Sequence, residues 1–172
     1  MQYSIRKGSV LFGTLIAIGL LIPGCVSTRT ALQRPSLNAA EPGITTAEQP
    51  DRARLIKIVD SYIGTCYLDG GMSRQGVDCS GFVWLVYKEL YGVTLPRSST
   101  ELFNIGDSLS LSEARPGDLV FFRKDLSHTV NHVGIFMGDS MFVHTSSACG
   151  VRYNSLSETY YKKRFAGIRR YQ

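Results

Sequence analysis

The chain has 172 residues, of which 44% are hydrophobic, and this length and composition suit one compact domain with short additions. The formal net charge of +5 is a mild basic bias, and no nucleic-acid-binding motif accompanies it. We therefore expect no nucleic-acid partner. The sequence carries no signal for an oligomeric state.

The first 24 residues have the pattern of a secretory signal peptide. Arg6 and Lys7 precede an apolar run over residues 10–22, which ends at Pro23 and Gly24. This run is shorter than the roughly 20 residues of a membrane-spanning helix, and no later apolar run reaches that length. We predict that residues 1–24 are cleaved and that the mature chain does not span a membrane.

The segment Ile22-Pro23-Gly24-Cys25 resembles the bacterial lipobox, in which a small residue precedes a cysteine that is acylated, palmitate included, and becomes the new N-terminus. The resemblance implies a membrane anchor at Cys25. The simpler alternative is a cleaved signal with an incidental cysteine. Val26 stands where Asp would retain a lipoprotein in the inner membrane, so the resemblance implies anchoring in the outer membrane, facing the periplasm.

Residues 25–50 have the composition of a flexible tether. They are rich in Ser, Thr, Ala and Pro, contain no aromatic residue, and show no helical or strand period. A coil of this length spans roughly 25–30 Å and can stretch to about 80 Å. Such a tether would present a folded domain of residues 51–172 to a polymer beside the membrane.

Two helices are predicted at the start of this domain. Apolar residues recur at helical spacing over residues 51–64 and again over residues 80–91. Gly64 and Gly92 are placed to end the two helices. Cys79 therefore falls at the N-terminus of the second helix.

The rest of the domain changes from helical to β character. Residues 65–77 are glycine-rich and predict a loop, whereas Ser98 to Glu101 form a capping-box pattern that opens a short helix ending near Gly106. Strand patterns follow over residues 118–122, 132–137, 141–146, 151–153 and 165–171. Helices first and strands later favour an α+β domain, in which the N-terminal helices pack on an antiparallel sheet.

Three cysteines remain once Cys25 is assigned to lipid. Cys66, Cys79 and Cys149 would lie in an oxidising compartment, and they lack the paired CxxC spacing of a structural zinc site. A helix N-terminus lowers a thiol's pKa through unpaired N–H groups and the helix dipole, so Cys79 is the candidate reactive thiol. These residues alone leave a buried, inert cysteine as the alternative. Cys66 and Cys149 are then free to form a disulfide.

Three motifs resemble, in order and spacing, those of the NlpC-type murein peptidase family. They are Gly-Val-Asp-Cys-Ser-Gly-Phe-Val at residues 76–83, Asn-His-Val-Gly-Ile-Phe at 131–136 and Phe-Val-His at 142–144. Further likeness lies at residues 67–71, 95–98 and 116–120, and the resemblance runs from about residue 51 to the C-terminus. It implies a papain-like fold with the nucleophile at a helix N-terminus.

Carried over position by position, the resemblance makes Cys79 the nucleophile and His132 the base that takes its proton. It makes His144 the residue that orients His132. A thiolate–imidazolium pair would attack the carbonyl, and water would release the acyl-enzyme. This chemistry implies no metal and no organic cofactor.

Other positions are expected to border the cleft. The resemblance places Tyr67 beside the nucleophile, where its hydroxyl would help hold the oxyanion, although a core aromatic is the alternative. Asp78 and Ser80 match positions at the substrate cleft, and Asp78 could instead cap the second helix. Cys66 and Asp69 depart from the family pattern at the cleft rim, so they leave the subsite preference open.

The resemblance implies hydrolysis of peptide bonds in the stem peptides of peptidoglycan, the polymer of the cell wall. The bond is either D-glutamyl–diaminopimelate or the D-alanyl–diaminopimelate crosslink. Two other classes stay open: an acyltransferase or lipid hydrolase using the same Cys and His, and a wall-binding module that does no chemistry.

Strand parity gives one geometric prediction. For His132 and His144 to meet, both must point to the same face of the sheet, and side chains alternate faces along a strand. A two-residue turn pairing Met137 with Ser140 would send them to opposite faces. We therefore predict a three-residue loop that pairs Met137 with Met141, or a bulge that restores the same parity.

Overall fold

The computed structural model describes residues 48–124 and 128–171. The predicted signal peptide, the predicted lipidation site Cys25 and the tether up to residue 47 lie outside the described residues. Residues 48–50, predicted as tether, belong instead to the first helix, because Pro50 is tolerated in a helix's first turn. None of the helices in the described part of the chain is long and apolar enough to cross a membrane.

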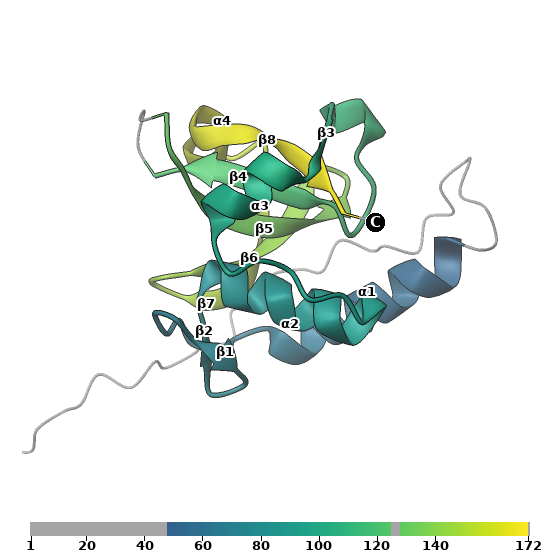
Figure 1. The fold of residues 1–172 in the computed structure, drawn as a ribbon, viewed down its shortest axis with the longest axis vertical. Helices are drawn as coiled ribbons and strands as arrows, with labels where there is room; N and C mark the ends of the chain where they lie inside the picture. Colours follow the sequence, from purple (N-terminus) through teal and green to yellow (C-terminus); the bar gives the residue numbers. More distant parts are fainter. Residues whose placement is uncertain (1–47, 125–127, 172) are drawn as a thin grey trace, which may run out of the picture.

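Two helices form one layer of the domain, as predicted (Figure 1). Helix α1 spans Glu48–Tyr62, and helix α2 spans Cys79–Tyr91 and ends at Gly92, whose φ is 71°. Except for Ile63, which follows α1 and is exposed, the residues that predicted the helical stripes are buried between the helices and the sheet. Tyr62 and Phe82 meet there edge to face, with ring centroids 5.9 Å apart.

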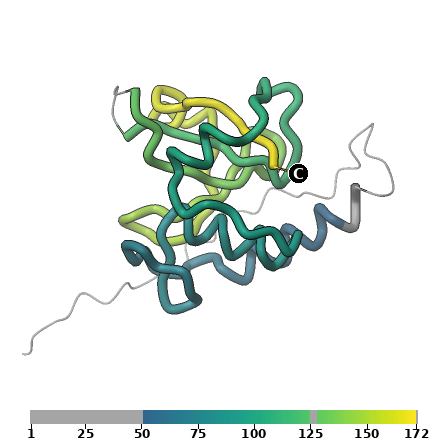
Figure 2. Tube along the Cα trace, viewed as in Figure 1, coloured from purple at the N-terminus to yellow at the C-terminus, as the bar shows by residue number. Residues whose placement is uncertain are grey.

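The second layer is a six-stranded antiparallel sheet with strand order β3-β8-β4-β5-β6-β7. Figure 1 labels its strands, and Figure 2 traces the chain through both layers. The strands are β3 (Asp107–Leu109), β4 (Leu119–Arg123), β5 (Val130–Gly138), β6 (Met141–Ser146), β7 (Gly150–Ser155) and β8 (Phe165–Arg170). This is the α+β architecture that the order of the sequence patterns predicted.

Several short elements were not predicted. Two-residue strands β1 (Met72–Ser73) and β2 (Gly76–Val77) form a hairpin inside the predicted loop. Helix α3 (Ser99–Ile105) was predicted from its cap, whereas strand β3, the 3-10 helix η1 (Leu111–Glu113) and helix α4 (Thr159–Arg164) were missed. None of these missed elements is long enough to show a clear apolar period.

The sheet is buried on both faces. Along β4, Leu119 and Phe121 face the cluster shared with α1 and α2, whereas Val120 and Phe122 face a second cluster. This second cluster includes Phe136, Phe142, Leu156 and Ile168, and Tyr161 of α4 packs against it. The continuous apolar run of β4 is explained by the cover on both sides.

The β5–β6 register confirms the parity prediction in its second form. Gly134 pairs with His144 and Phe136 with Phe142, but Gly138 pairs with Met141. The loop is therefore a two-residue turn, and the preferred three-residue loop is wrong. A bulge at Met137 restores the parity, so the two histidines share a face.

Gly134 is required where β5 lies against β6, because the space beside it has no room for a side chain. A Cβ at this position would lie 2.7 Å from the carbonyl oxygen of Val143 and 3.1 Å from Cβ of His144. We expect Gly134→Ala to lower the free energy of unfolding by about 1–3 kcal/mol, since the strands must separate to admit the methyl group. Urea unfolding measures this loss, with the exposed Gln75→Ala as control; an unchanged midpoint would refute the close approach.

Candidate active site

The N-terminus of α2 holds Cys79 in a fixed frame. Asp78 is the N-cap, as one of the two interpretations of the sequence predicted, and its carboxylate accepts the Gly81 backbone N–H at 2.5 Å. The hydroxyl of Ser80 lies 3.0 Å from the same carboxylate and 2.8 Å from the carbonyl oxygen of Arg97. Thr145 of β6 donates its hydroxyl to the carbonyl of Asp78, which ties the cap to the sheet.

Arg97 compensates the charge of the cap. Its guanidinium forms an ion pair with Asp78 at 3.1 Å, and both side chains are partly buried. Sequence reasoning included Arg97 only as part of a matching motif. Because the carboxylate already accepts from Gly81, Ser80 and Arg97, it is engaged in shaping the helix start. Substrate binding by Asp78 and Ser80 stays a prediction.

The thiol of Cys79 is half-buried and packs against the cluster shared with the helices. Burial raises the pKa of Cys79, and this effect outweighs the backbone N–H groups of Val133, Ser80 and Cys79 itself, which act in the opposite direction. The sequence predicted a lowered pKa from the helix N-terminus alone. That prediction is wrong, because desolvation of the thiolate depends on the sheet packed over the helix end.

A raised pKa leaves Cys79 as a neutral thiol at neutral pH. We expect its alkylation by iodoacetamide to quicken with pH throughout the neutral range without reaching a plateau, since only the thiolate reacts. A chain with Cys25, Cys66 and Cys149 changed to Ser isolates this thiol. A plateau reached below pH 7 would instead show a resting thiolate–imidazolium pair.

His132 and His144 are brought together as predicted. Nε2 of His132 and Nδ1 of His144 are 2.8 Å apart, and the rings meet edge to face with centroids at 4.9 Å. His144 is buried, whereas His132 is half-buried and lies against Phe122. Burial lowers the pKa of His132 to about 3, with a smaller contribution from His144, and burial lowers that of His144 to about 4. Both rings are therefore neutral at neutral pH.

The link between Cys79 and this histidine pair runs through β5. The backbone N–H of Val133, the residue after His132, interacts with the Cys79 sulfur. Among the described residues, no hydrogen bond joins the thiol to the His132 ring, whose Nε2 faces His144. Catalytic hydrogen bonds are often long in an enzyme without substrate and tighten in the complex.

Three further residues extend the histidine pair and were missed by sequence reasoning. Nε2 of His144 lies 3.0 Å from Oδ1 of Asn154 and 3.0 Å from the hydroxyl of Tyr161. The amide of Asn154 in turn donates to both carboxylate oxygens of Glu158, at 3.0 and 2.9 Å. Strand parity could have found Asn154, because β7 pairs Arg152 with His144 and so places Asn154 on the same face.

Tyr67 lies in the loop that precedes α2, close to Cys79. It forms an isolated parallel bridge with Val77, two residues before the nucleophile candidate, and 39% of its side chain is exposed, so it is not a core aromatic. Its hydroxyl donates to Asp69 at 3.3 Å. Burial, then the charge of Asp69, raises the pKa of Tyr67. An oxyanion-binding role for Tyr67 stays a prediction.

Cys66 and Cys149 are both exposed free thiols, so the disulfide that the sequence left open is not formed in this structure. Their backbones are nonetheless close, because a Cβ on Gly150 would lie 3.2 Å from Cα of Cys66. The Val151 backbone N–H also donates to the Thr65 carbonyl at 2.9 Å. This contact fixes the start of β7 against the loop that carries Tyr67.

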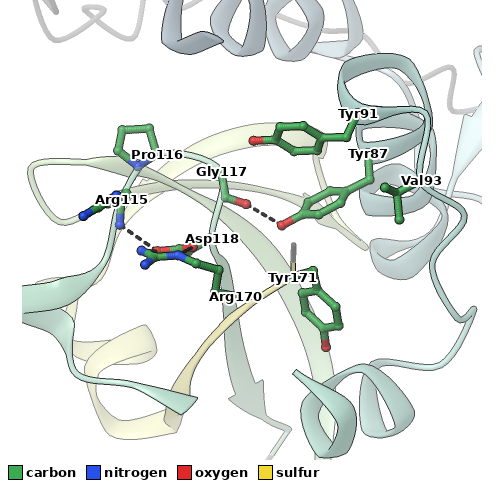
Figure 3. A pocket seen from close by; sticks show the side chains of 9 residues that line it. All are labelled: Tyr87, Tyr91, Val93, Arg115, Pro116, Gly117, Asp118, Arg170 and Tyr171. Carbon is green, nitrogen blue, oxygen red and sulfur yellow. Dashed lines mark hydrogen bonds and ion pairs between the residues drawn. The ribbon is translucent and has the colours of Figure 1, made fainter. Parts of the chain in front are cut away.

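A pocket of about 370 Å³ lies away from the histidine pair, between the C-terminal half of α2 and the end of β8 (Figure 3). The Tyr87 hydroxyl donates to the carbonyl of Gly117 at 2.7 Å, and Arg170 pairs with the buried Asp118 at 2.7 Å. None of the predicted site residues lines this pocket. Its polar contacts join α2, the loop before β4 and β8, and so they hold the two layers together.

Comparison with known proteins agrees with this geometry. The NlpC/P60 family model matches residues 64–170. The chain is 38% identical over 168 residues to the murein DD-endopeptidase MepS/murein LD-carboxypeptidase of Escherichia coli K12, covering 90% of this chain and 88% of the relative.

Two solved structures share the fold. An NlpC/P60 family protein from Bacillus cereus superimposes with a TM-score of 0.65 at 33% identity, over 70% of this chain and 40% of that one. A lipoprotein-like NLP/P60 family protein from Staphylococcus aureus gives 0.64 at 29% identity, over 76% and 44%. This chain thus spans less than half of either solved protein. With its motifs, histidine pair and papain-like fold, the chain belongs to the NlpC/P60 family.

Proposed function

We propose that this protein is a murein endopeptidase, a cysteine peptidase that hydrolyses peptide bonds of the stem peptides or their crosslinks in peptidoglycan. The observation that carries the proposal is the hydrogen-bonded pair of His132 on β5 and His144 on β6, two strands that pack against α2, the helix that begins with Cys79. The identity of 38% to a murein endopeptidase along nearly the whole chain supports the same substrate.

In the mechanism that we propose, Cys79 is the nucleophile and His132 the base. Both start neutral, so His132 takes the thiol proton as sulfur attacks the carbonyl carbon, and the imidazolium then protonates the leaving amine. Water, deprotonated by His132, attacks the thioester and releases the acid. His144 holds the His132 ring in plane and stabilises the imidazolium that forms.

The oxyanion and the substrate are held around the start of α2. The Cys79 backbone N–H is directed at the developing oxyanion, and Tyr67 contributes its hydroxyl once the substrate displaces Asp69 from it. Asp78 and Ser80 border the cleft and keep the helix start rigid, with Arg97 as their partner. Rigid support of this kind maintains the attack geometry.

The location follows from the N-terminal pattern. Residues 1–24 serve as the signal peptide, Cys25 carries the lipid anchor in the outer membrane, and the tether that follows extends the domain toward the cell wall. Labelled palmitate incorporated into the protein in cells, and lost in Cys25→Ser, supports the anchor. Equal labelling of both proteins rejects it.

The experiment that tests the activity uses purified muropeptides. A crosslinked dimer and a monomer with an intact D-glutamyl–diaminopimelate bond are incubated with the mature protein, and products are identified by mass spectrometry. Conversion of dimer to monomers assigns the crosslink, whereas a new N-terminus on diaminopimelate within the monomer assigns the other bond. If both substrates stay intact while a lipid ester is cleaved, the proposed function is wrong.

A further inference from the structure

The amide of Asn154 has a defined orientation beside the histidine pair. Both carboxylate oxygens of Glu158 lie within 3.0 Å of Nδ2, and a carboxylate only accepts hydrogen bonds. The Ser155 backbone N–H also donates to Glu158, at 2.8 Å, and holds it in place. The NH2 end of Asn154 must therefore face Glu158, which turns its oxygen toward Nε2 of His144, 3.0 Å away.

This orientation determines which nitrogens carry protons. An amide oxygen only accepts, so Nε2 of His144 bears the hydrogen and, in a neutral ring, Nδ1 is bare. That bare nitrogen accepts from Nε2–H of His132, 2.8 Å away. His132 is then left with a bare Nδ1, the only form of the neutral ring that can take a proton at that atom.

We propose that Asn154, oriented by Glu158, is a positioning residue that fixes the tautomers of both histidines and keeps Nδ1 of His132 ready to accept a proton. The inference rests on the proposed function in one respect, namely that His132 acts as the base. The inference extends the site to two residues that support the histidine pair, since neither Asn154 nor Glu158 belongs to the motifs from which the site was predicted.

Because of Tyr161, the tautomers of the two histidines would differ without Asn154. Its hydroxyl also lies 3.0 Å from Nε2 of His144, and a hydroxyl can either donate or accept. Burial, first among several causes, raises the pKa of Tyr161 to about 12, so the hydroxyl keeps its proton. Without Asn154, Tyr161 would donate to Nε2, His144 would donate from Nδ1 to His132, and the proton of His132 would move to Nδ1.

The test reads both the tautomer and the rate. In wild-type protein labelled with ¹⁵N, side-chain correlation spectra should show a bare Nδ1 and a protonated Nε2 on each ring. Asn154→Leu, which fills the space and excludes water, should move the proton of His132 to Nδ1. It should lower kcat on a crosslinked muropeptide by roughly 10- to 100-fold with KM little changed, because substrate binding is untouched.

Double variants separate tautomer selection from a structural role. Tyr161→Phe removes the competing donor, so Asn154→Leu/Tyr161→Phe should recover part of the kcat that Asn154→Leu alone loses. Should Asn154→Leu fail to fold, Glu158→Ala serves instead. Glu158 is exposed, and its loss lets the Asn154 amide turn its NH2 end toward His144. Lys163→Ala on the same helix is the matched control.

Protonated Nδ1 on His132 in the wild type would overturn the inference, as would unchanged spectra and kcat in both Asn154→Leu and Glu158→Ala. Equal losses in Asn154→Leu and in its double variant with Tyr161→Phe would also overturn it, because they would indicate a structural effect. The spectra need no substrate. Absence of murein hydrolysis by a wild type with the expected tautomers therefore rejects the proposed function and not the tautomer assignment.

Discussion

Replacing Cys79 by alanine is expected to lower kcat/KM on a crosslinked muropeptide by roughly 10⁴-fold or more, because no acyl-enzyme can form without the thiol. The fold should be retained. Alanine fits the half-buried helix start, and the cap formed by Asp78 and Arg97 does not involve the sulfur. Steady-state kinetics and urea unfolding on the same preparations measure the two effects.

The matched control for this variant is Cys149→Ala. Cys149 is an exposed thiol in the turn between β6 and β7, so its loss should leave kcat/KM within about twofold of wild type. Retention of more than a tenth of the activity by a folded Cys79→Ala would contradict its role as nucleophile. A large loss of kcat/KM in Cys149→Ala would show that the reactive thiol is not Cys79 alone.

His132→Ala is expected to lower kcat by roughly 10²- to 10⁴-fold, the usual contribution of a general acid–base group. His144→Ala should cost less, because it disturbs the orientation of the base without removing it. The imidazole of His132 is neutral from about pH 4 upward, since its pKa is lowered to about 3. Wild-type activity should therefore persist to a pH well below the ordinary pKa of histidine.

The controls for this series are His128→Ala, which alters an exposed residue, and urea unfolding of each variant. If His144→Ala lowers kcat as much as His132→Ala or more, the assignment of His132 as the base and His144 as the orienting residue is contradicted. A pH–rate profile whose acid limb lies near pH 6.5 would show that His132 is not desolvated as the structure implies.

The sequence predicted the two main helices and the sheet because burial imposes long, regular patterns. Leu55 and Val59, or Phe82 and Val86, face the same cluster one helical turn apart. A strand of two or three residues, such as β3, or a helix of six, such as α4, shows no comparable period. Tertiary contacts therefore decide whether such short elements form.

The loop between β5 and β6 shows where parity reasoning reaches its limit. It predicted the shared face of the histidines, which depends on pairing alone. It missed the turn, because Asp139 and Ser140 adopt φ values of 49° and 59°. A positive φ is unusual for a serine, so the sequence does not predict this turn. The bulge at Met137, which restores the parity that the two-residue turn changes, has no recognisable sequence pattern either.

The residues of the candidate site were predicted by motif, but their electrostatics were not. The direction of the Cys79 pKa depends on how much of the thiol the sheet covers, and a helix N-terminus alone suggests the opposite sign. The contacts of Asn154 and Glu158 with the histidine pair similarly require β7 and α4 to be placed in space.

Digestion of isolated sacculi is the measurement that tests the central claim most directly. The mature protein and its Cys79→Ala variant are incubated in parallel with sacculi, and the muropeptides are then analysed by mass spectrometry. We predict new peptide termini, at the crosslink or on diaminopimelate, in the wild-type digest and none in the variant digest. Equal cleavage by both proteins, or a wild-type digest with every peptide bond intact, would contradict a cysteine peptidase that acts on murein.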